Sequence, residues 1–332
     1  MLSAERRWDL ADAARALIRA VTGSSVAAVT SNFDFRPIVC PTCGVDDTRF
    51  CGRRGGAAHR DGTGELCNIV RCRRCELLYA NPFPFPRNLD SLYSQTAGYF
   101  SLHDDQATKT NSREALIAAL EKLTPNRRLL DVGAGLGETV AAALRRGWDA
   151  WGVEQAQAFA AKADELCPGR IFHGPLDAAP ASFVGEPFDA IVLATVLEHL
   201  HEPTKVLAAI SKLLKPGGVL FLDVPNESAL YFKIGNLWNR AQRRDWVVNL
   251  APTFSPYHVF GFNKKSLAAM LHKHGLEPEV WHVYAGQSVL PLRRSLRGVA
   301  EWLASEAVHV AATVGDQGTY IECYARKPVA AS

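Results

Sequence analysis

The clearest chemical spacing in this chain is a glycine turn that follows a short apolar run. In the stretch DVGAGLG, Gly133, Gly135 and Gly137 alternate with other residues directly after the run ends at Val132. Glycine reaches backbone angles that other residues avoid, and it lets a ligand approach the main chain without a Cβ atom in between. We therefore expect this turn to hold a bound molecule. A tight strand-to-helix connection that binds nothing is the alternative.

Two acidic residues narrow the kind of molecule that the turn would hold. Asp131 precedes the turn. Glu154 ends the next apolar run, about 20 residues further along, where an acid can accept hydrogen bonds from a ribose diol. A nicotinamide-binding turn reads G-x-G-x-x-G and presents its helix N-terminus to a pyrophosphate. The different spacing here, with an acid in front of it, favours a ligand with a ribose and a cationic amino acid portion.

A second set of residues has the spacing of metal ligands. Two C-x-x-C pairs read CPTC and CRRC, and two such turns close a tetrahedral zinc site. The predicted ligands are Cys40, Cys43, Cys72 and Cys75. Four cysteine ligands leave no open position, so we expect a structural zinc. A redox pair or unrelated free thiols are alternatives, and substitute ligands are available at Cys51, Cys67 and His59.

The elements that must position these residues alternate between strands and helices. Continuous apolar runs predict buried strands at 128–132, 148–154, 188–194 and 218–225, and such runs are typical of a parallel sheet covered on both faces. Helical patterns lie between them, at 138–147 and 205–215. Repeated βα units predict an α/β fold, a doubly wound Rossmann-like sheet.

In this order the motifs resemble the class I S-adenosylmethionine-dependent methyltransferases, in the group with a methyltransferase-23-like domain. The resemblance covers 92–327 and is firmest over 129–226, where FDAIVLATVLEHLHEPTKVLAAISKLLKPGGVLFLDVPN is similar to the family's fourth strand, the loop after it, a helix and the fifth strand. It implies S-adenosylmethionine as cofactor, with Pro175 standing where the family usually has an acid. The cofactor-binding residues that it implies are Asp131, Gly133, Ala134, Gly135, Gly137, Glu154, Gln155, Leu176, Asp177 and Thr195.

Methyl transfer from a sulfonium needs positioning of the acceptor and removal of its proton. The loop TVLEHLHEP offers Glu198 and His199 for this, and FSPYHVFGF adds His258. Some family members that act on catechols or RNA 3′ ends place two glutamates and two histidines around a divalent metal. Thr195 stands in place of the first of those glutamates, so we favour a metal-free base at His199. A purely packing role for this loop is the alternative.

The stretch 231–257 interrupts the fold after the fifth strand. It carries two tryptophans and three arginines, which suit an acceptor lid that binds a phosphate or carboxylate. These residues are Trp238, Arg240, Arg243, Arg244 and Trp246. An amphipathic helix that covers the edge of the core is an equal alternative.

The sequence divides into four parts. We expect an amphipathic helix and polar linker at 1–36, a zinc ribbon at 37–86, a helical connector at 87–125 and the methyltransferase domain at 126–328, with the lid as an insertion. The second part resembles the zinc ribbon that precedes the catalytic domain in some small-molecule methyltransferases. Prolines in YANPFPFP exclude a helix at the end of that part.

Composition limits the partners. A net charge of +3 is too small to indicate nucleic acid. No apolar stretch reaches the roughly 18 residues of a membrane span, and paired cysteines fit a reducing cytoplasm. We predict a cytoplasmic methyltransferase for the hydroxyl or a sugar carbon of a small molecule, in natural-product or surface-glycan biosynthesis. The alternatives are an rRNA or tRNA methyltransferase and a non-catalytic binding protein, and the sequence does not indicate an oligomeric state.

Overall fold

The structure is a computed structural model that describes residues 31–88, 106–285 and 306–329, apart from 309, 314 and 316. The chain divides into two units, Met1–Asn32 and Phe33–Ser332, and the second contains all of the helices and strands given below. The helix expected near the N-terminus lies outside the described residues.

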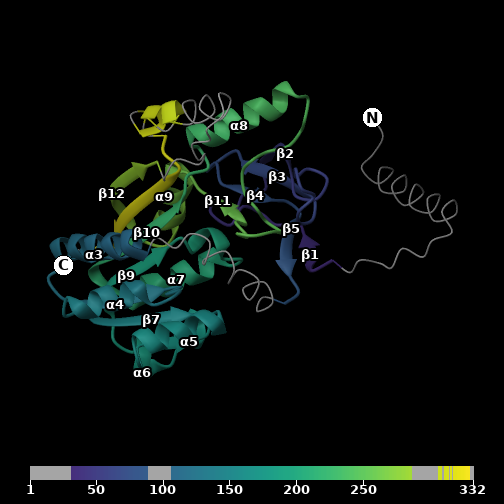
Figure 1. Ribbon diagram of the computed structural model, residues 1–332. Helices are drawn as coiled ribbons and strands as arrows, with labels where there is room; N and C mark the ends of the chain where they lie inside the picture. The colour runs from purple at the N-terminus through teal and green to yellow at the C-terminus, as the bar shows by residue number, and fades with distance from the viewer. Residues whose placement is uncertain are drawn as a thin grey trace. The chain divides into compact units, whose positions relative to one another are not determined.

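A mixed sheet of seven strands forms the centre of the described fold, in the order β12-β13-β10-β9-β6-β7-β8 (Figure 1). Five of its strands are parallel, and β13 joins them antiparallel to β10. Their bounds are β6 Arg128–Val132, β7 Asp149–Glu154, β8 Ile171–His173, β9 Phe188–Ala194, β10 Leu214–Pro225, β12 Glu277–Tyr284 and β13 Tyr320–Arg326. The four strands expected from apolar runs are all present, which confirms the Rossmann-like fold class.

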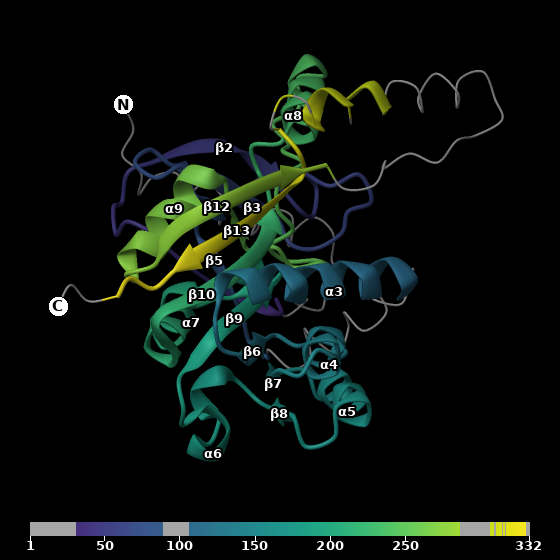
Figure 2. The ribbon, with the colours of Figure 1, turned by 90° about the vertical axis from the view of Figure 1, so that its left-hand side faces the viewer.

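Helices cover both faces of this sheet (Figure 2). Alternate residues of one strand point to opposite faces, so Leu129 packs with α3 and α4 while Leu130 packs in the core that includes α7 and α9. The helices are α3 Gln106–Leu123, α4 Glu138–Arg145, α5 Gln157–Leu166, α6 Ala181–Val184, α7 Pro203–Leu213, α8 Leu230–Ala241 and α9 Lys264–Lys273. Two 3₁₀ turns, η1 Leu176–Ala178 and η2 Leu197–His199, follow strands β8 and β9.

The cysteine pairs belong to a second, four-stranded sheet in the order β11-β4-β3-β2. Its strands are β2 Thr48–Arg54, β3 Cys67–Cys72, β4 Leu78–Ala80 and β11 Phe260–Gly261. The last of these comes from the stretch 126–328, which is expected to form the methyltransferase domain, so the ribbon is completed by a distant segment.

Two predicted boundaries differ from the structure. The stretch expected as polar linker contains β1 Phe33–Arg36, which pairs with β5 Phe83–Pro86 because the proline-rich stretch is extended. The described part of the expected connector is the long helix α3, whose Ile117 and Leu120 are fully buried against α4 and the sheet. Helix α3 is therefore part of the helical layer that covers one face of the seven-stranded sheet.

Candidate active site

A cavity of about 710 Å³ opens where β6, β7 and β9 end. Strand β6 has a parallel neighbour on each side. The chain continues from β6 to β7 and β8 on one side and then returns to β9 and β10 on the other. Doubly wound folds bind their ligands at such a reversal of strand order. The predicted residues that line it are Asp131, Gly133, Ala134, Gly135, Glu154, Gln155, Leu176, Asp177, Thr195, Glu198, His199 and His258. All of the predicted cofactor-binding and catalytic residues except Gly137 thus surround one space.

The glycine turn folds against the end of β7. The backbone N–H groups of Gly133 and Ala134 both donate to the carbonyl oxygen of Val153, at 2.8 and 3.0 Å. Gly135 has a φ of 55°, and a Cβ added there would meet no protein atom within 4 Å. The space beside Gly135 is therefore open to a ligand, whereas its backbone angle suits glycine.

Gly137 has a different task. It lies outside the cavity lining and forms the N-cap of α4 with a φ of 82°. A Cβ there would stand 3.1 Å from the Cβ of Ala163 in α5. Gly137 permits the close packing of α4 and α5, so its role is in helix packing.

Glu154 fixes the turn from the neighbouring strand. Its carboxylate accepts hydrogen bonds from the backbone N–H of Gly135 at 2.8 Å and of Ala156 at 2.7 Å. Burial raises the pKa of Glu154, while these N–H groups oppose that shift. A carboxylate has about four acceptor sites, so the group retains capacity to accept hydrogen bonds from a ribose.

Asp131 and Arg113 form the charged end of the cavity. Burial raises the pKa of Asp131 to about 6, and nearby Arg113 together with a hydrogen bond to Thr139 acts in the opposite direction. Arg113 stands on α3 and lines the cavity. Sequence analysis missed this cation, because α3 reads as a connector and its approach to β6 is a tertiary contact.

The exit from the third parallel strand supplies another wall. Pro175, Leu176 and Asp177 line the cavity, and Leu176 is buried. The carboxylate of Asp177 pairs with the ammonium of Lys205 at 2.9 Å, and this contact lowers its pKa. Asp177 is thus tied to α7.

Glu198, His199 and His258 meet at the other end of the cavity. Oε1 of Glu198 lies 3.7 Å from Nε2 of His199 and 4.0 Å from Nε2 of His258. The two imidazole rings are 4.8 Å apart, edge to face. Glu198 is 1% exposed, and neither of its carboxyl oxygens has a hydrogen-bond partner among the described residues.

Burial controls the charges of this group. It raises the pKa of Glu198 well above its usual value and lowers the pKa of His199 to about 4 and of His258 to about 3. Nδ1 of His199 lies 3.3 Å from the carbonyl oxygen of Tyr257, which can only accept. The proton of the neutral ring therefore sits on Nδ1, and Nε2 is left as an unprotonated acceptor.

His201 is a further histidine in the cavity that sequence analysis missed. Its Nε2 is buried without a hydrogen-bond partner in the described part of the chain, and burial lowers its pKa to about 4. The ring stands edge-on to Phe83 of β5, with centroids 5.7 Å apart. The spacing H-L-H in the loop after β9 was its only sequence signal.

Two residues of the cavity wall have strained backbone angles. Thr195 and Tyr257 line the cavity with φ angles of 52° and 62°, which residues with side chains rarely adopt. Thr195 donates its hydroxyl to the carbonyl oxygen of Ala194 at 2.8 Å.

Most of the predicted lid lies elsewhere. Of the stretch 231–257, only Pro256 and Tyr257 line the cavity. Helix α8 has no buried residue, and Trp238 is 66% exposed. The guanidinium of Arg244 stacks over the ring of Trp246 at 4.8 Å. The tryptophans and arginines proposed for acceptor binding are therefore not in the cavity.

The four predicted zinc ligands form one cluster. Sγ of Cys40 lies 3.4 Å from Sγ of Cys75, the same distance separates Cys43 from Cys72, and all four sulfurs lie within 4.8 Å of one another. Zinc–sulfur bonds of about 2.3 Å require sulfurs about 3.8 Å apart in a tetrahedron. The proposed substitutes Cys51, Cys67 and His59 are not in this cluster.

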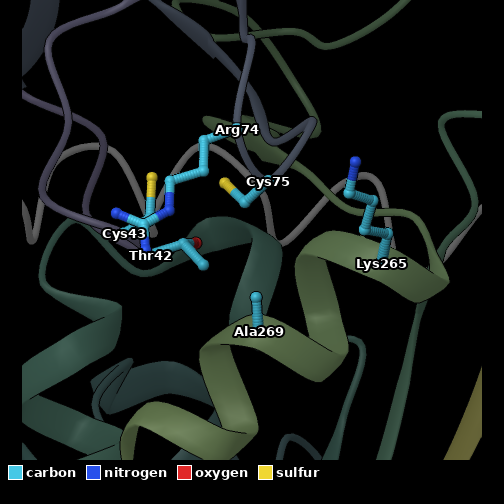
Figure 3. Close-up of a pocket in the computed structure, with 6 residues that line it drawn as sticks. All are labelled: Thr42, Cys43, Arg74, Cys75, Lys265 and Ala269. Atoms are coloured by element: carbon cyan, nitrogen blue, oxygen red, sulfur yellow. The ribbon is translucent and has the colours of Figure 1, made fainter.

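The four clustered cysteines would repel one another if all were ionised, so a bound cation is needed to stabilise them as thiolates. A hydrogen bond from Cys40 lowers the pKa of Cys75 to about 5, and the same contact together with burial raises the pKa of Cys40. This hydrogen bond stabilises one thiolate, that of Cys75, and keeps Cys40 protonated. A zinc ion would stabilise all four cysteines as thiolates. Figure 3 shows Arg74 and Cys43 among the residues that line a small cavity of about 330 Å³. The charge of Arg74 would partly offset that of a zinc tetrathiolate.

A family model and the curated relatives both indicate a methyltransferase. The sequence profile of a family described as a methyltransferase domain matches residues 104–282, more than half of the chain. The ubiquinone biosynthesis O-methyltransferase of Xylella fastidiosa (strain 9a5c) is 27% identical over 58% of this chain and 78% of its own length. The enzyme of the same description from Methylococcus capsulatus is 33% identical over 31% of this chain and 45% of its own.

Solved structures of methyltransferases also match this chain, at lower sequence identity. Magnesium protoporphyrin IX methyltransferase of Synechocystis PCC 6803, solved with bound SAH, is 12% identical with a TM-score of 0.43, over 66% of this chain and 82% of its own. A putative methyltransferase in complex with the Trm112 activator of Haloferax volcanii has 15% identity and a TM-score of 0.47, over 73% and 99%.

The chain belongs to this family and is a class I S-adenosylmethionine-dependent methyltransferase. A search of the described helices finds none that is both long and apolar enough to cross a bilayer.

Proposed function

We propose that this enzyme transfers the methyl group of S-adenosylmethionine to a hydroxyl group of a small-molecule acceptor. The observation that carries the proposal is the unprotonated Nε2 of His199, in the same cavity as the glycine turn and Glu154. A donor site and a neutral base thus share one space. Relatives described as O-methyltransferases support a hydroxyl as the acceptor group.

The donor occupies the end of the cavity formed by β6 and β7. Its ribose diol donates to Glu154, and its ammonium lies near the glycine turn and Asp131. Arg113 is the cation that can face the methionine carboxylate, because it lines the cavity beside Asp131. Adenine lies against Leu176 and Asp177 at the exit of β8.

The acceptor hydroxyl then faces His199. Its oxygen attacks the methyl carbon, the bond from that carbon to sulfur breaks, and both electrons stay on sulfur as S-adenosylhomocysteine forms. The hydroxyl proton passes to Nε2 of His199 and from there to solvent. His258 contacts the same space, and its neutral ring avoids a positive charge next to the sulfonium.

The alternative to a metal-free base is a divalent cation bound by Glu198, His199 and His258, and one observation favours it. The two carboxyl oxygens of Glu198 are buried and lack partners in the described structure, which is costly for an ionised group. The three side chains could hold a metal. Thr195 removes the fourth ligand that metal-dependent relatives use, so we propose the metal-free base.

Zinc in the four-cysteine cluster is structural in this proposal. Cys40, Cys43, Cys72 and Cys75 fit it in number, spacing and chemistry, and none lines the large cavity. Its contribution is to hold the ribbon, since structural zinc supplies folding free energy.

We place the reaction in natural-product or surface-glycan biosynthesis, within a reducing cytoplasm. A sugar carbon and an RNA base are the other acceptors to consider, and the low net charge disfavours RNA.

The test is to incubate the enzyme with methyl-deuterated donor and a metabolite extract, with catechols and hydroxylated glycans as defined acceptors. We expect a labelled O-methyl product and no loss of activity with EDTA. A labelled carbon, labelled RNA, or activity that EDTA abolishes and Mg²⁺ restores would contradict the respective part of the proposal.

A further inference from the structure

The cysteine ribbon and the acceptor end of the cavity share one folded unit. Strand β11 completes the ribbon sheet through pairs of Phe260 with Tyr79 and of Gly261 with Leu78. Phe83 stacks on Phe260 with ring centroids 5.0 Å apart. Because β11 begins two residues after His258, the ribbon fixes the chain on one side of that histidine.

The ribbon also fixes the chain on the other side. We call residues 245–258 the strap. Its first part pairs with β2, since the N–H of Arg53 donates to the carbonyl oxygen of Asp245 at 2.7 Å and the N–H of Val247 donates to that of Arg53 at 3.0 Å. A Cβ on Gly52 would lie 2.6 Å from the carbonyl oxygen of Asp245, so this approach depends on a glycine in the ribbon.

The middle of the strap is held by a reciprocal pair of hydrogen bonds. The hydroxyl of Thr253 accepts from the N–H of Glu65 and donates to its carbonyl oxygen, both at 2.9 Å. Thr253 is 5% exposed. Glu65 lies in the loop between β2 and β3, which links the two cysteine pairs in sequence.

Two further side chains of the ribbon hold the strap next to Thr253. Arg54 donates through Nε to the carbonyl oxygen of Leu250 at 3.0 Å and lies over the ring of Phe254 at 5.1 Å. The ring of His59 packs against the same Phe254 ring, with centroids 4.9 Å apart. Backbone, hydroxyl, cation and ring contacts thus all run from the ribbon to the strap.

The end of the strap is a wall of the cavity. Pro256, Tyr257 and His258 line it, and the carbonyl oxygen of Tyr257 is the group that sets the proton of His199. The donor end is built differently, because the glycine turn and Glu154 are held by hydrogen bonds among β6, β7 and their own loops.

We propose that the zinc ribbon is a positioning element of the acceptor half of the active site: through Arg54, Glu65 and Thr253 it holds the strap that carries Tyr257 and His258. Loss of zinc then releases the acceptor wall while the donor half stays formed. The inference rests on the proposed function in assigning the strap to acceptor binding, so its test uses no acceptor and no turnover.

The first experiment removes zinc from the full-length protein with a mercurial reagent and a chelator. S-adenosylhomocysteine serves as the probe of the donor half, by calorimetry. Backbone hydrogen exchange and carbethoxylation of His258, both located by mass spectrometry, report on the strap. We expect exchange over 245–262 to become at least about tenfold faster, as for a segment that opens locally, and His258 to become reactive, while the affinity for the probe changes by less than about twofold.

The second experiment leaves the cysteines intact. Thr253→Val keeps the shape but removes both hydrogen bonds, Thr253→Ser restores them, and Thr63→Val makes the same change at an exposed position of the same loop. We expect faster exchange of the strap and reactive His258 in Thr253→Val alone, with zinc content and probe affinity unchanged. A strap that stays protected without zinc and in Thr253→Val, or a probe affinity that falls together with strap protection, overturns the inference.

Discussion

At the scale of residues, the chemistry depends on buried groups whose charges are suppressed. His199, His201 and His258 all have lowered pKa values because burial disfavours the imidazolium. The carboxyls of Asp223 and Glu227, which do not line the cavity, have pKa values raised to about 7 for the corresponding reason. An active site that must accept a proton next to a cationic donor benefits from neutral bases.

The first prediction concerns pH. A base with a pKa near 4 is unprotonated throughout the neutral range, so turnover should stay level from pH 8 down to pH 6 and fall only as pH approaches about 4. His199→Ala should lower turnover by about 10²–10⁴-fold and leave donor affinity nearly unchanged. Initial rates against pH measure this. An acid limb near pH 6.5 would show that the base is exposed, and full turnover in His199→Ala would leave the loop with a packing role.

The second prediction separates the two ends of the donor. Glu154→Gln should weaken binding of both S-adenosylhomocysteine and methylthioadenosine by about 1.5–3 kcal/mol, the range for hydrogen bonds to a charged group. Arg113→Gln should weaken the first by a similar amount and leave the second unchanged, since methylthioadenosine lacks the carboxylate. Lys162→Gln, exposed on α5, is the control for loss of a surface charge. Calorimetric titration measures these affinities. If Arg113→Gln weakened binding of both ligands equally, Arg113 would not be the partner of the carboxylate.

At the scale of elements, the sequence predicts what local patterns encode. Strands β6, β7, β9 and β10 were expected because buried parallel strands are apolar throughout. Arg113 and His201 were not expected in the site. Arg113 reaches the cavity because α3 packs near β6, and His201 is packed against Phe83 of β5, and neither tertiary contact is visible in the local sequence. The lid expectation overestimated the aromatic and basic residues of 231–257, because composition does not reveal which face of an insertion meets the site.

The third prediction distinguishes two glycines of one turn. Gly135→Ala and Gly137→Ala should each cost about 1–2 kcal/mol of stability, because alanine disfavours the left-handed region. Gly137→Ala should lose more, since its Cβ meets Ala163. The added methyl group of Gly135→Ala meets no protein atom within 4 Å but points into the space expected for the ligand. Its larger effect should therefore be on the affinity for S-adenosylhomocysteine. Thermal melts and titrations of both variants test this, and identical behaviour would contradict the separate roles.

At the scale of the whole molecule, the cysteine ribbon shares a buried hydrophobic cluster with the catalytic part. Cys40, Cys72 and Cys75 of the ribbon lie in the same buried cluster as Leu197 and Phe260 of the catalytic part. The ribbon is therefore part of the enzyme's folded structure, although its sequence reads as a separate module.

The fourth prediction follows from this shared core. The purified enzyme should contain about one zinc per chain. Cys72→Ser should lower the melting temperature and release the metal, because one ligand of the tetrahedron is lost. Cys51→Ser, outside the cluster, is the matched control and should retain zinc. Metal analysis and melts decide. A metal-free preparation with an unchanged melt would refute the zinc assignment.

The most direct test of the central claim is a crystal structure of the enzyme with S-adenosylhomocysteine. We predict the ribose hydroxyls on Glu154, the carboxylate near Arg113, and the sulfur directed toward Nε2 of His199. A ligand that lies outside this cavity, or one whose sulfur faces away from His199, would contradict the proposed mechanism.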